Sequence, residues 1–214
     1  MRGDRALPAA TERDRALRAT AELWSELGYE RLSAPSISAR AGIDAKAFAN
    51  IFAEVEAAAE AAIEVPLAAV VTVVAELYSP DRSEAESYAM AVVGILEWMA
   101  DNPAYTYLGY IAGRQMAPPR VHSVYESGHQ FLVAMLERLW ASSTLTEQPA
   151  RAGLAALGAA EAVVRREIVA GRFARLPALA PDFVYGAITP FLGQEEGLRL
   201  AELSRQLVKE EPPR

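Results

Sequence analysis

Apolar side chains near the N-terminus recur every three or four residues, which is the period of an amphipathic helix. Across residues 13–28 this stripe consists of Leu17, Thr20, Leu23, Trp24 and Leu27. The charged side chains lie elsewhere around the same helix, at Arg15, Arg18, Glu22 and Glu26. The segment ends at Gly28, a residue type that is common just after a helix. The pattern therefore predicts a first helix with one buried face.

Two further short helices are predicted by the stretch SAPSISARAGIDAKAFANIF, which follows this segment. Ser33 is a suitable N-cap, and Pro35 falls within the first turn, where a missing N–H costs nothing. Gly42 tolerates the left-handed conformation with which helices often end. Asp44 then caps a helix over residues 45–52. Two helices separated by so tight a turn have the spacing of a helix-turn-helix.

The three predicted helices together bury one small core. Trp24, Ile37, Phe48 and Phe52 are the side chains that we expect to meet there, because a helix-turn-helix needs a third helix to enclose its apolar faces. Lys46 and Asn50 lie on a different strip of the third helix from Phe48 and Phe52. That strip is free to face the major groove of DNA.

The rest of the chain is divided by proline, glycine and asparagine into further predicted helices. These cover residues 54–78 with a bend or restart at Pro66, 83–100 opened by a capping box of Ser83 and Glu86, a segment from Asn102, 121–140, 148–171, and 182–210 with a kink or split at Pro190. The chain has no internal repeat and no low-complexity linker. We therefore predict an all-α fold.

The N-terminal segment resembles the DNA-binding domain of the tetracycline-repressor (TetR) family of bacterial transcription regulators. The matching motifs are Ala-x-Leu-Trp-x-x-x-Gly-Tyr at residues 21–29, Ser33-x-x-x-Ile37, Ala41-Gly42-Ile43 at the turn, and Phe48 with Phe52. The resemblance implies an N-terminal three-helix helix-turn-helix domain and a larger C-terminal helical effector-binding and dimerisation domain. We assign residues 1–12 to a flexible arm, 13–53 to the DNA-binding domain and 54–214 to the ligand-binding and dimerisation domain.

The resemblance also implies a function, that of a DNA-binding transcriptional regulator that acts as a repressor. A twofold homodimer would present two readers to the half-sites of a palindromic operator in double-stranded DNA. A small, largely apolar effector would release the DNA by favouring one separation of the readers. The long helix after the reader would transmit this change, with Pro66 as its bend point.

The predicted reading helix offers few groups to DNA bases. The positions expected to face the bases are Ala45, Lys46, Ala47, Ala49 and Asn50. Only Lys46 and Asn50 carry side-chain donors, which suit guanine and adenine respectively. The alternative is that these two side chains lie on a solvated surface and do not bind DNA. Ser33 and Ser36 are expected to donate to phosphate from the second helix. An arm containing Arg2, Arg5 and Arg13 would add charge, and its alternative is disorder.

Two departures from the family weaken the expected DNA contacts. Ala47-Phe48-Ala49 stands where the family usually has Thr-Leu-Tyr, and Val55 replaces a Lys that usually follows the third helix. By resemblance that Tyr and Lys contact phosphate, so their loss lowers both the affinity and its salt dependence. Residues 1–52 carry eight basic and seven acidic side chains, whereas residues 53–214 carry thirteen and twenty-one. These features keep open an alternative, a dimeric helical ligand-binding sensor with a weakened or lost DNA reader.

Large aromatic and thioether side chains gather in the middle of this alanine-rich chain. They are Trp98, Met99, Tyr105, Tyr107, Tyr110, Met116, Phe131 and Met135. Such side chains line apolar pockets in which a few phenolic hydroxyls orient a ligand, although each is equally typical of an ordinary core. The resemblance favours a ligand-binding pocket for the cluster as a whole.

Both histidines fall on one predicted helix. His122, Glu126 and His129 follow one another at i, i+4 and i+7, and the Glu-x-x-His spacing also occurs in carboxylate-bridged iron sites. A second such motif is missing from the sequence, and the strip lies roughly 130° from the centre of the apolar face. We therefore expect the strip to meet solvent or a pocket rim, and we expect neither a metal site nor a cofactor.

The C-terminal third offers a surface for a partner helix. Its small side chains are Ala152, Gly153, Ala155, Ala156, Gly158, Ala159 and Ala160, interleaved with Leu154, Leu157 and Val164, and the last helix adds Leu198, Ala201, Leu203 and Leu207. In the resembling family the last two long helices of each chain form a four-helix dimer interface. The alternative is packing within one chain.

Composition narrows the remaining functional classes. The chain has no cysteine, which excludes disulfides, thiolate zinc sites and a cysteine nucleophile. It also lacks a Gly-rich phosphate loop and a nucleophile elbow, so we do not expect an enzyme. The first fifteen residues lack the apolar region of a secretory signal, and the apolar run over residues 65–75 is too short to span a bilayer. We therefore expect a cytoplasmic protein without membrane partners.

Overall fold

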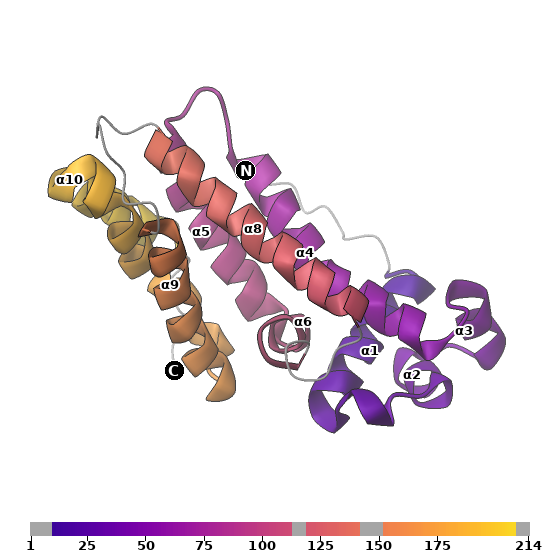
Figure 1. Ribbon diagram of the computed structural model, residues 1–214. Helices are drawn as coiled ribbons and strands as arrows, with labels where there is room; N and C mark the ends of the chain where they lie inside the picture. The colour runs from indigo at the N-terminus through magenta and orange to yellow at the C-terminus, as the bar shows by residue number, and fades with distance from the viewer. Residues whose placement is uncertain (1–9, 113–118, 142–151, 209–214) are drawn as a thin grey trace, which may run out of the picture.

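The computed structural model describes residues 10–112, 119–141 and 152–208, which are helical and contain no β-strand (Figure 1). The predicted all-α class is therefore confirmed. The N-terminal elements are α1 (Glu12–Leu27), η1 (Tyr29–Arg31), α2 (Ala34–Ala41) and α3 (Ala45–Ile51). The elements after them are α4 (Val55–Leu77), α5 (Glu84–Asp101), α6 (Pro103–Tyr107), a π-helical turn η2 (Leu108–Ala112), α8 (Pro119–Ala141), α9 (Ala152–Val169), η3 (Phe173–Arg175), η4 (Pro177–Leu179) and α10 (Ala180–Leu207).

The helix-turn-helix is defined by local capping bonds. Ser33 and Ser36 form a capping box at the start of α2, and Gly42 ends that helix in the left-handed conformation, with φ of 64°. The Asp44 carboxylate accepts a hydrogen bond of 2.7 Å from the backbone N–H of Ala47 and so starts α3. The three predicted helices are confirmed to within one or two residues at each end. Thr11 caps α1, which therefore begins at Glu12 rather than at residue 13.

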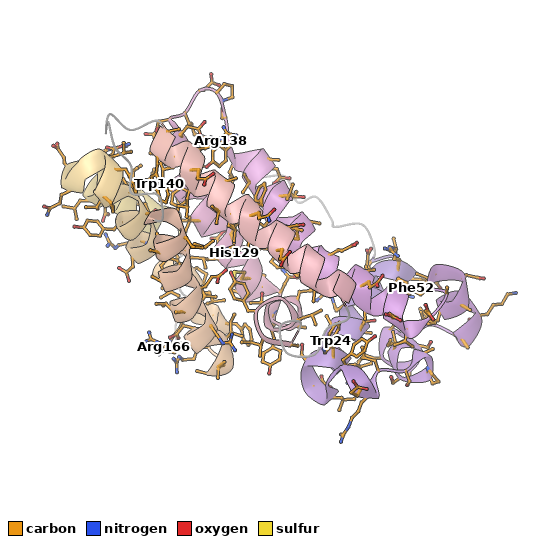
Figure 2. The ribbon with its side chains drawn as sticks, in the orientation of Figure 1. Trp24, Phe52, His129, Arg138, Trp140 and Arg166 are labelled. Carbon is orange, nitrogen blue, oxygen red and sulfur yellow. The ribbon has the colours of Figure 1, made fainter. Side chains whose placement is uncertain are left out.

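A first hydrophobic core fills the space between α1, α2, α3 and the start of α4 (Figure 2). Trp24, Ile37, Phe48 and Phe52 are all buried in it, as the sequence predicted. The Phe48 and Phe52 rings pack with centroids 5.7 Å apart. Aromatic side chains bury large areas, so this small unit gains a core that its length alone would not supply.

Ionic contacts on the surface hold α2 against α1. The Arg40 guanidinium contacts the carboxylates of Glu22 at 3.2 Å and Glu26 at 2.8 Å. Hydrogen bonding to Arg40 lowers the pKa of Glu26. Arg15 adds a hydrogen bond of 3.0 Å from its Nε to the carbonyl oxygen of Ala41. The angle between the first two helices is thus fixed from outside as well as by the core.

The long helix α4 runs from the helix-turn-helix into the C-terminal bundle, where it lies beside α8 (Figure 1). It is continuous through Pro66, so the expected restart at this residue does not occur. Its first half is buried at Ala58, Ala62 and Ile63. Among the described helices α4 alone is long and apolar enough to cross a membrane by length and composition. The predicted helix over residues 54–78 is thus confirmed, and its apolar part extends beyond residues 65–75.

A second hydrophobic core lies between α5, α8, α9 and α10. Its most closely packed aromatic pair is Trp140 on α8 and Phe191 on α10, with centroids 4.3 Å apart. The Trp140 indole also donates to the carbonyl oxygen of Ala187, at 3.4 Å. In Figure 2 Trp140 lies at the end of the bundle that is remote from Trp24 and Phe52. The two cores thus occupy opposite ends of the molecule.

The segment α6–η2 joins the two cores. Tyr105 and Leu108 are buried in the first core, although they lie far along the sequence from the helix-turn-helix. Trp98 packs against both cores, and its ring stacks on that of Tyr105 with centroids 6.4 Å apart. Burial raises the pKa of Tyr105 to about 12, so this phenol stays neutral. The first core is therefore packed against the bundle through α6 as well as through α4.

The last helix breaks at a different residue from the one expected. The sequence predicted a kink or split at Pro190, but the non-helical residue inside α10 is Gly193, with φ of 86° and ψ of 168°. Glycine adopts this conformation without a Cβ penalty, whereas the φ of proline is compatible with a helix even though its ring removes a backbone hydrogen bond and crowds the preceding turn. The residues after Gly193 pack against α5, where Arg199 contacts Glu86 at 3.1 Å.

Candidate functional site

The outer surface of α3 is the candidate DNA-reading surface. Ala45, Lys46, Ala49 and Asn50 are exposed there, and Ala47 is half-buried. Phe48 points in the opposite direction, into the first core. The structure therefore brings the predicted base-facing residues together on one side of α3. Lys46 and Asn50 supply the side-chain donors of that side.

Ser33 and Ser36, expected to donate to phosphate, lie at the start of α2 and bond each other. The Ser33 hydroxyl donates to Ser36 Oγ at 2.9 Å, and the Ser36 hydroxyl donates to the Ser33 carbonyl oxygen at 2.8 Å. Each hydroxyl has a single proton to donate. A phosphate contact from either side chain would therefore require this capping arrangement to change.

Little positive charge surrounds the reading surface in the described structure. Arg40 is held by two carboxylates on α1, and Arg13 lies over the ring of Phe52, 5.2 Å from its centroid. Glu54 and Glu56 are exposed just after α3. Arg2 and Arg5 of the predicted arm lie outside the described residues. The electrostatic attraction for phosphate on this side thus depends mainly on Lys46.

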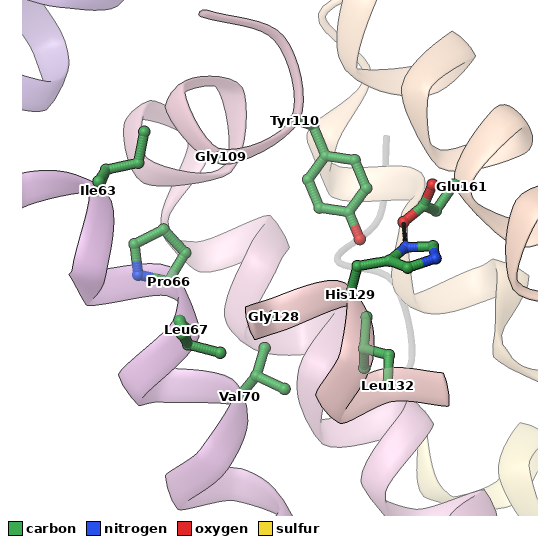
Figure 3. Close-up of a pocket in the computed structure, with 10 residues that line it drawn as sticks. All are labelled: Ile63, Pro66, Leu67, Val70, Gly109, Tyr110, Gly128, His129, Leu132 and Glu161. Atoms are coloured by element: carbon green, nitrogen blue, oxygen red, sulfur yellow. Dashed lines mark hydrogen bonds and ion pairs between the residues drawn. The ribbon is translucent and has the colours of Figure 1, made fainter. Parts of the chain in front are cut away.

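A cavity of about 120 Å³ lies between α4, η2, α8 and α9 and is called the outer cavity below (Figure 3). Its lining residues are Ile63, Pro66, Leu67, Val70, Gly109, Tyr110, Gly128, His129, Leu132 and Glu161. Gly109 lies close to Pro66, since a Cβ at Gly109 would sit 3.5 Å from the proline ring. The cavity therefore touches the same α4 that carries the helix-turn-helix.

One corner of the outer cavity is polar. His129 Nδ1 on α8 lies 3.3 Å from Glu161 Oε1 on α9, and the Tyr110 hydroxyl points toward this pair (Figure 3). The side chain of Glu161 is 21% exposed and that of His129 is 35% exposed, so both are partly shielded from water. Opposite them stand the aliphatic side chains of α4. The cavity thus has the makeup of a small-molecule site, largely apolar with a few convergent polar groups.

An inner cavity of about 80 Å³ adjoins the outer one inside the second core. The two share Tyr110, Leu132 and Glu161 as lining residues. The residues that line the inner cavity alone are Tyr88, Val92, Ile95, Leu96, Met99, Met135, Leu136, Leu157, Ala160, Val164 and Phe183. A ligand in the outer cavity is thus separated from the inner one by only a few side chains.

The predicted ligand-binding cluster is only partly gathered around these cavities. Tyr110 lines both, and Met99 and Met135 line the inner one. Trp98, Tyr105, Tyr107 and Phe131 line neither, because they pack where the two cores meet or on the bundle surface, and Met116 lies outside the described residues. Ligand binding by these residues remains a prediction.

The sequence reasoning missed the residues of α4 and the His129–Glu161 pair. The aliphatic positions of α4 carried no signal that separates a pocket wall from a core. The sequence pattern singles out His129 only as part of a strip with Glu126 and His122. The side chain of His122 lies outside the described residues, and the residues that are described include no group of three or more metal-ligating side chains. Glu161 lies 32 residues from His129, too far for a spacing rule to connect them.

The surface proposed for a partner helix is divided by the structure. Leu157, Ala160 and Val164 face inward and line the inner cavity, so for them packing within the chain is the observed outcome. Leu154, Ala155, Gly158 and Ala159 are exposed on the other side of α9. On α10 Leu198 and Leu207 are exposed, whereas Ala201 is buried. An apolar strip thus remains exposed on the two last long helices.

No family model matches the sequence, and no curated protein matches it either. The fold, in contrast, is similar to several solved structures. TylP, a TetR regulator from Streptomyces fradiae, is 18% identical with a TM-score of 0.71, over 97% of this chain and 100% of that one. A TetR-like transcriptional regulator from Rhodococcus sp. RHA1 is 24% identical with a TM-score of 0.69, and the match covers 86% of this chain and 97% of that one. The transcriptional regulator FadR from Bacillus subtilis, solved in complex with stearoyl-CoA, is 14% identical with a TM-score of 0.69. The match covers 82% of this chain and 97% of that one.

These likenesses show that the chain has the fold of TetR-type transcription regulators. The resemblance read from the N-terminal motifs is confirmed as a fold that extends over almost the whole chain. The similar proteins named above are regulators of transcription rather than enzymes.

Proposed function

We propose that this protein is a DNA-binding transcriptional regulator that represses from a palindromic operator and is released by a small, largely apolar effector. The observation that carries the proposal is the position of the outer cavity. It is bounded by Pro66 and Leu67 of α4, the helix whose first residue follows the helix-turn-helix by only a few positions. A ligand at this point contacts the element that sets the orientation of the reader.

The mode of DNA binding follows from the exposed side of α3. Lys46 and Asn50 would read bases in the major groove, and Ala45, Ala47 and Ala49 would allow close approach of the helix and contact with thymine methyl groups. The start of α2, with Ser33 and Ser36, would lie against the phosphate backbone. Two such readers in a homodimer would match two half-sites about one helical turn apart.

Effector coupling would act through the packed contacts of α4. Pro66 contacts the π-helical turn η2, and η2 together with α6 is packed into the first core through Leu108 and Tyr105. A ligand that separates α4 from η2 and α8 would change the tilt of α4 and hence of the reader. The ligand would reduce DNA affinity by the ratio of its affinities for the two arrangements.

The alternative function is that of a dimeric helical ligand sensor with a weakened or lost DNA reader. Two observations favour it. Lys46 is the one cationic side chain on the exposed side of α3, and the Arg40 guanidinium is paired with Glu22 and Glu26. Both functions use the same cavity, so ligand binding does not separate them. Binding of double-stranded DNA at low salt does.

Fluorescence anisotropy with labelled DNA from upstream of the gene tests the proposal, with a scrambled duplex as the control. We expect tighter binding to the upstream DNA and weaker binding as salt increases, because phosphate contacts release counterions. Equal binding to both duplexes, even at low salt, would contradict the proposed function and favour the sensor.

A further inference from the structure

We infer that the effector is an elongated molecule with a flexible aliphatic tail, which lies in the inner cavity while the other end of the molecule lies in the outer cavity against α4. This inference rests on the proposed function, because it assigns a shape and a chemical class to the effector of the same site. It comes from three features of the two cavities: their sizes, the walls that they share and the apolar lining of the inner one.

Each cavity alone is smaller than one that holds a single benzene ring. The outer cavity has a volume of about 120 Å³ and the inner one about 80 Å³, whereas an apolar cavity that holds benzene has roughly 150 Å³. The two cavities adjoin, because Tyr110, Leu132 and Glu161 line both of them. A narrow molecule that extends from one cavity into the other would therefore use both volumes, whereas a compact molecule would use only one.

The inner cavity is lined mostly by apolar side chains of the second core. Leu96 and Met99 are typical of this lining and are at most 4% exposed. The polar residues of the described lining are Tyr88, Tyr110 and Glu161, of which the last two belong to the boundary with the outer cavity. A polar end group buried here would lose hydrogen bonds to water, whereas a methylene chain gains by leaving water. The inner cavity therefore suits the tail of a ligand.

Two methionines allow the inner cavity to adapt to a chain. Met99 on α5 and Met135 on α8 both line it. The methionine side chain is unbranched and flexible, so it fills irregular gaps and changes its conformation easily. A narrow chain that enters past Tyr110 and Leu132 is thus accommodated by side-chain movement, without displacement of the helices of the second core.

The two ends of such a ligand would contact different parts of the molecule. Pro66, Leu67 and Val70 of α4 line the outer cavity, whereas the inner cavity is lined from α5, η2, α8, α9 and α10. The tail is therefore anchored in the second core, and the other end contacts the helix that carries the reader. Tail length should set the affinity for the ligand, and the end against α4 should set how completely DNA is released at saturation.

Isothermal titration calorimetry of the full chain with straight-chain alcohols, from butan-1-ol to nonan-1-ol, tests the inference. We expect the affinity to rise about fourfold with each added methylene until the tail fills the inner cavity, and then to stop rising. The isomers hexan-1-ol and 3,3-dimethylbutan-1-ol share one composition and differ in shape. The branched isomer should bind about fourfold or more weakly, because its methyl groups cannot follow one another into the inner cavity.

Three variants locate the tail. Ala160→Leu fills part of the inner cavity, so the affinity should stop rising at a shorter alcohol while butan-1-ol binds as it does to the wild type. Leu157→Ala enlarges the same cavity and should extend the rise to longer alcohols. Ala134→Leu adds the same side chain on the exposed surface of α8 and should leave the whole series unchanged.

The two cavity variants act in opposite directions, so Leu157→Ala decides the question if Ala160→Leu does not fold. A dependence on chain length that Leu157→Ala leaves unchanged would overturn the inference. Equal affinities for the two isomers, an affinity that does not rise with chain length, or no binding of any alcohol would do the same.

The same probes separate failure of this inference from failure of the proposed function. Calorimetry measures binding without DNA, so the position of the tail is tested even if the protein does not bind an operator. If the alcohols bind as expected and operator DNA is never bound, the two-cavity site is confirmed and the proposed function is wrong. If 3,3-dimethylbutan-1-ol releases operator DNA at least as well as hexan-1-ol, in the wild type and in Ala160→Leu alike, the proposed function stands and the elongated effector is wrong.

Discussion

Glu167 is a nearly buried carboxylate at the end of α9, and its two partners are arginines. Arg172 donates from Nε to Glu167 Oε2 at 2.7 Å and from Nη2 to Glu167 Oε1 at 3.0 Å. Arg166 Nε lies 3.4 Å from Glu167 Oε1. Arg172 also donates its backbone N–H to the Glu167 carbonyl oxygen at 2.9 Å. This pair therefore holds the turn that connects α9 to η3 and α10.

The Glu167 pair should make stability depend on pH. Hydrogen bonding to Arg172 lowers the pKa of Glu167 from 4.5 to about 2, so the folded state favours the carboxylate. Its contribution to stability is fully present above about pH 4.5 and is lost as the pH falls toward about 2. Urea unfolding of the wild type and Glu167→Gln should show a less stable variant at neutral pH and a shrinking difference below pH 4.5.

The exposed substitution Glu137→Gln serves as the control for this experiment, because its side chain lies on the outer surface of α8. It should change stability little at any pH. A difference between wild type and Glu167→Gln that stays constant from neutral pH down to about pH 3 would show that the ionised pair does not stabilise the folded state.

Capping residues were predictable from the sequence, whereas long-range pairs were not. Ser33, Asp44 and Ser83 each bond to a backbone N–H three residues later, so sequence spacing alone identifies them. His129 and Glu161 meet only because α8 packs against α9. The polar corner of the cavity was therefore visible only in the structure, although one of its two residues was noticed in the sequence.

At the scale of elements, the break in α10 at Gly193 brings Gly197, after the break, close to Thr189 and Tyr185, before it. Gly197 is buried, and a Cβ at this position would clash with Thr189 Oγ1 and lie 3.3 Å from the ring of Tyr185. Glycine at 197 thus allows the residues after the corner to fold back against those before it. The final part of α10 can then pack on α5.

We predict that Gly197→Ala lowers the free energy of unfolding by about 1–3 kcal/mol, because the added methyl overfills the corner. Thr189→Ala removes the oxygen that the methyl would meet, so the double variant should recover much of this loss. Thermal or chemical unfolding of the two single variants and the double variant completes the cycle. A Gly197→Ala protein at least as stable as the wild type would contradict the packing described for α10.

Pro66 is placed to couple the cavity to α4, since it lines the outer cavity and contacts η2. We predict that Pro66→Ala keeps DNA affinity within a few-fold of the wild type but weakens the effector's ability to reduce that affinity. Alanine at this position would restore the backbone N–H that proline lacks, and a less easily bent α4 would transmit less of the ligand's displacement to the reader. Anisotropy with operator DNA, with and without the effector, measures both quantities.

An unchanged effector response in Pro66→Ala would remove this residue from the coupling mechanism. Pro103→Ala is a suitable comparison, because Pro103 lies exposed at the start of α6 and lines neither cavity. It should leave the effector response as in the wild type.

The order and extent of the helices followed well from the sequence, but their breaks did not. Periodicity and caps predicted α1 to α5 closely, because those signals are local. The sequence predicts a bend or restart at Pro66 and a kink or split at Pro190. The helix α4 does not restart at Pro66, and the non-helical residue inside α10 is Gly193 rather than Pro190. Packing around a proline can keep a helix intact, whereas a positive φ requires a glycine at that place.

At the scale of the whole molecule, the apolar strip of α9 is proposed as part of a twofold interface. Leu154 is 52% exposed and lies beside Ala155, Gly158 and Ala159, which would let a second backbone approach closely. We predict that Leu154→Glu converts the dimer to a monomer, because two carboxylates would be buried at the interface. Analytical ultracentrifugation measures the change.

Ala134→Glu places the same charge on the exposed side of α8 and should leave the dimer intact. If Leu154→Glu remains as dimeric as the wild type, or if the wild type is a monomer at micromolar concentration, the strip on α9 is not the interface.

The global arrangement was predictable only through family resemblance. The sequence motifs cover the helix-turn-helix, and the structure extends the likeness in fold to almost the whole chain, as with TylP over 97% of it. The outer cavity was not predictable, because its wall combines residues 63–70, 109–110, 128–132 and 161, which share no pattern along the chain. Aliphatic side chains of this kind look alike in a core and in a pocket.

The central claim is that the exposed side of α3 reads DNA, and the most direct test compares the wild type with Lys46→Ala/Asn50→Ala. Both would be titrated onto upstream and scrambled duplexes at low and moderate salt. We predict that the wild type prefers the upstream duplex, and that the double variant loses roughly tenfold or more of this preference. Equal affinity of the wild type for both duplexes, or an unchanged preference in the double variant, would contradict it.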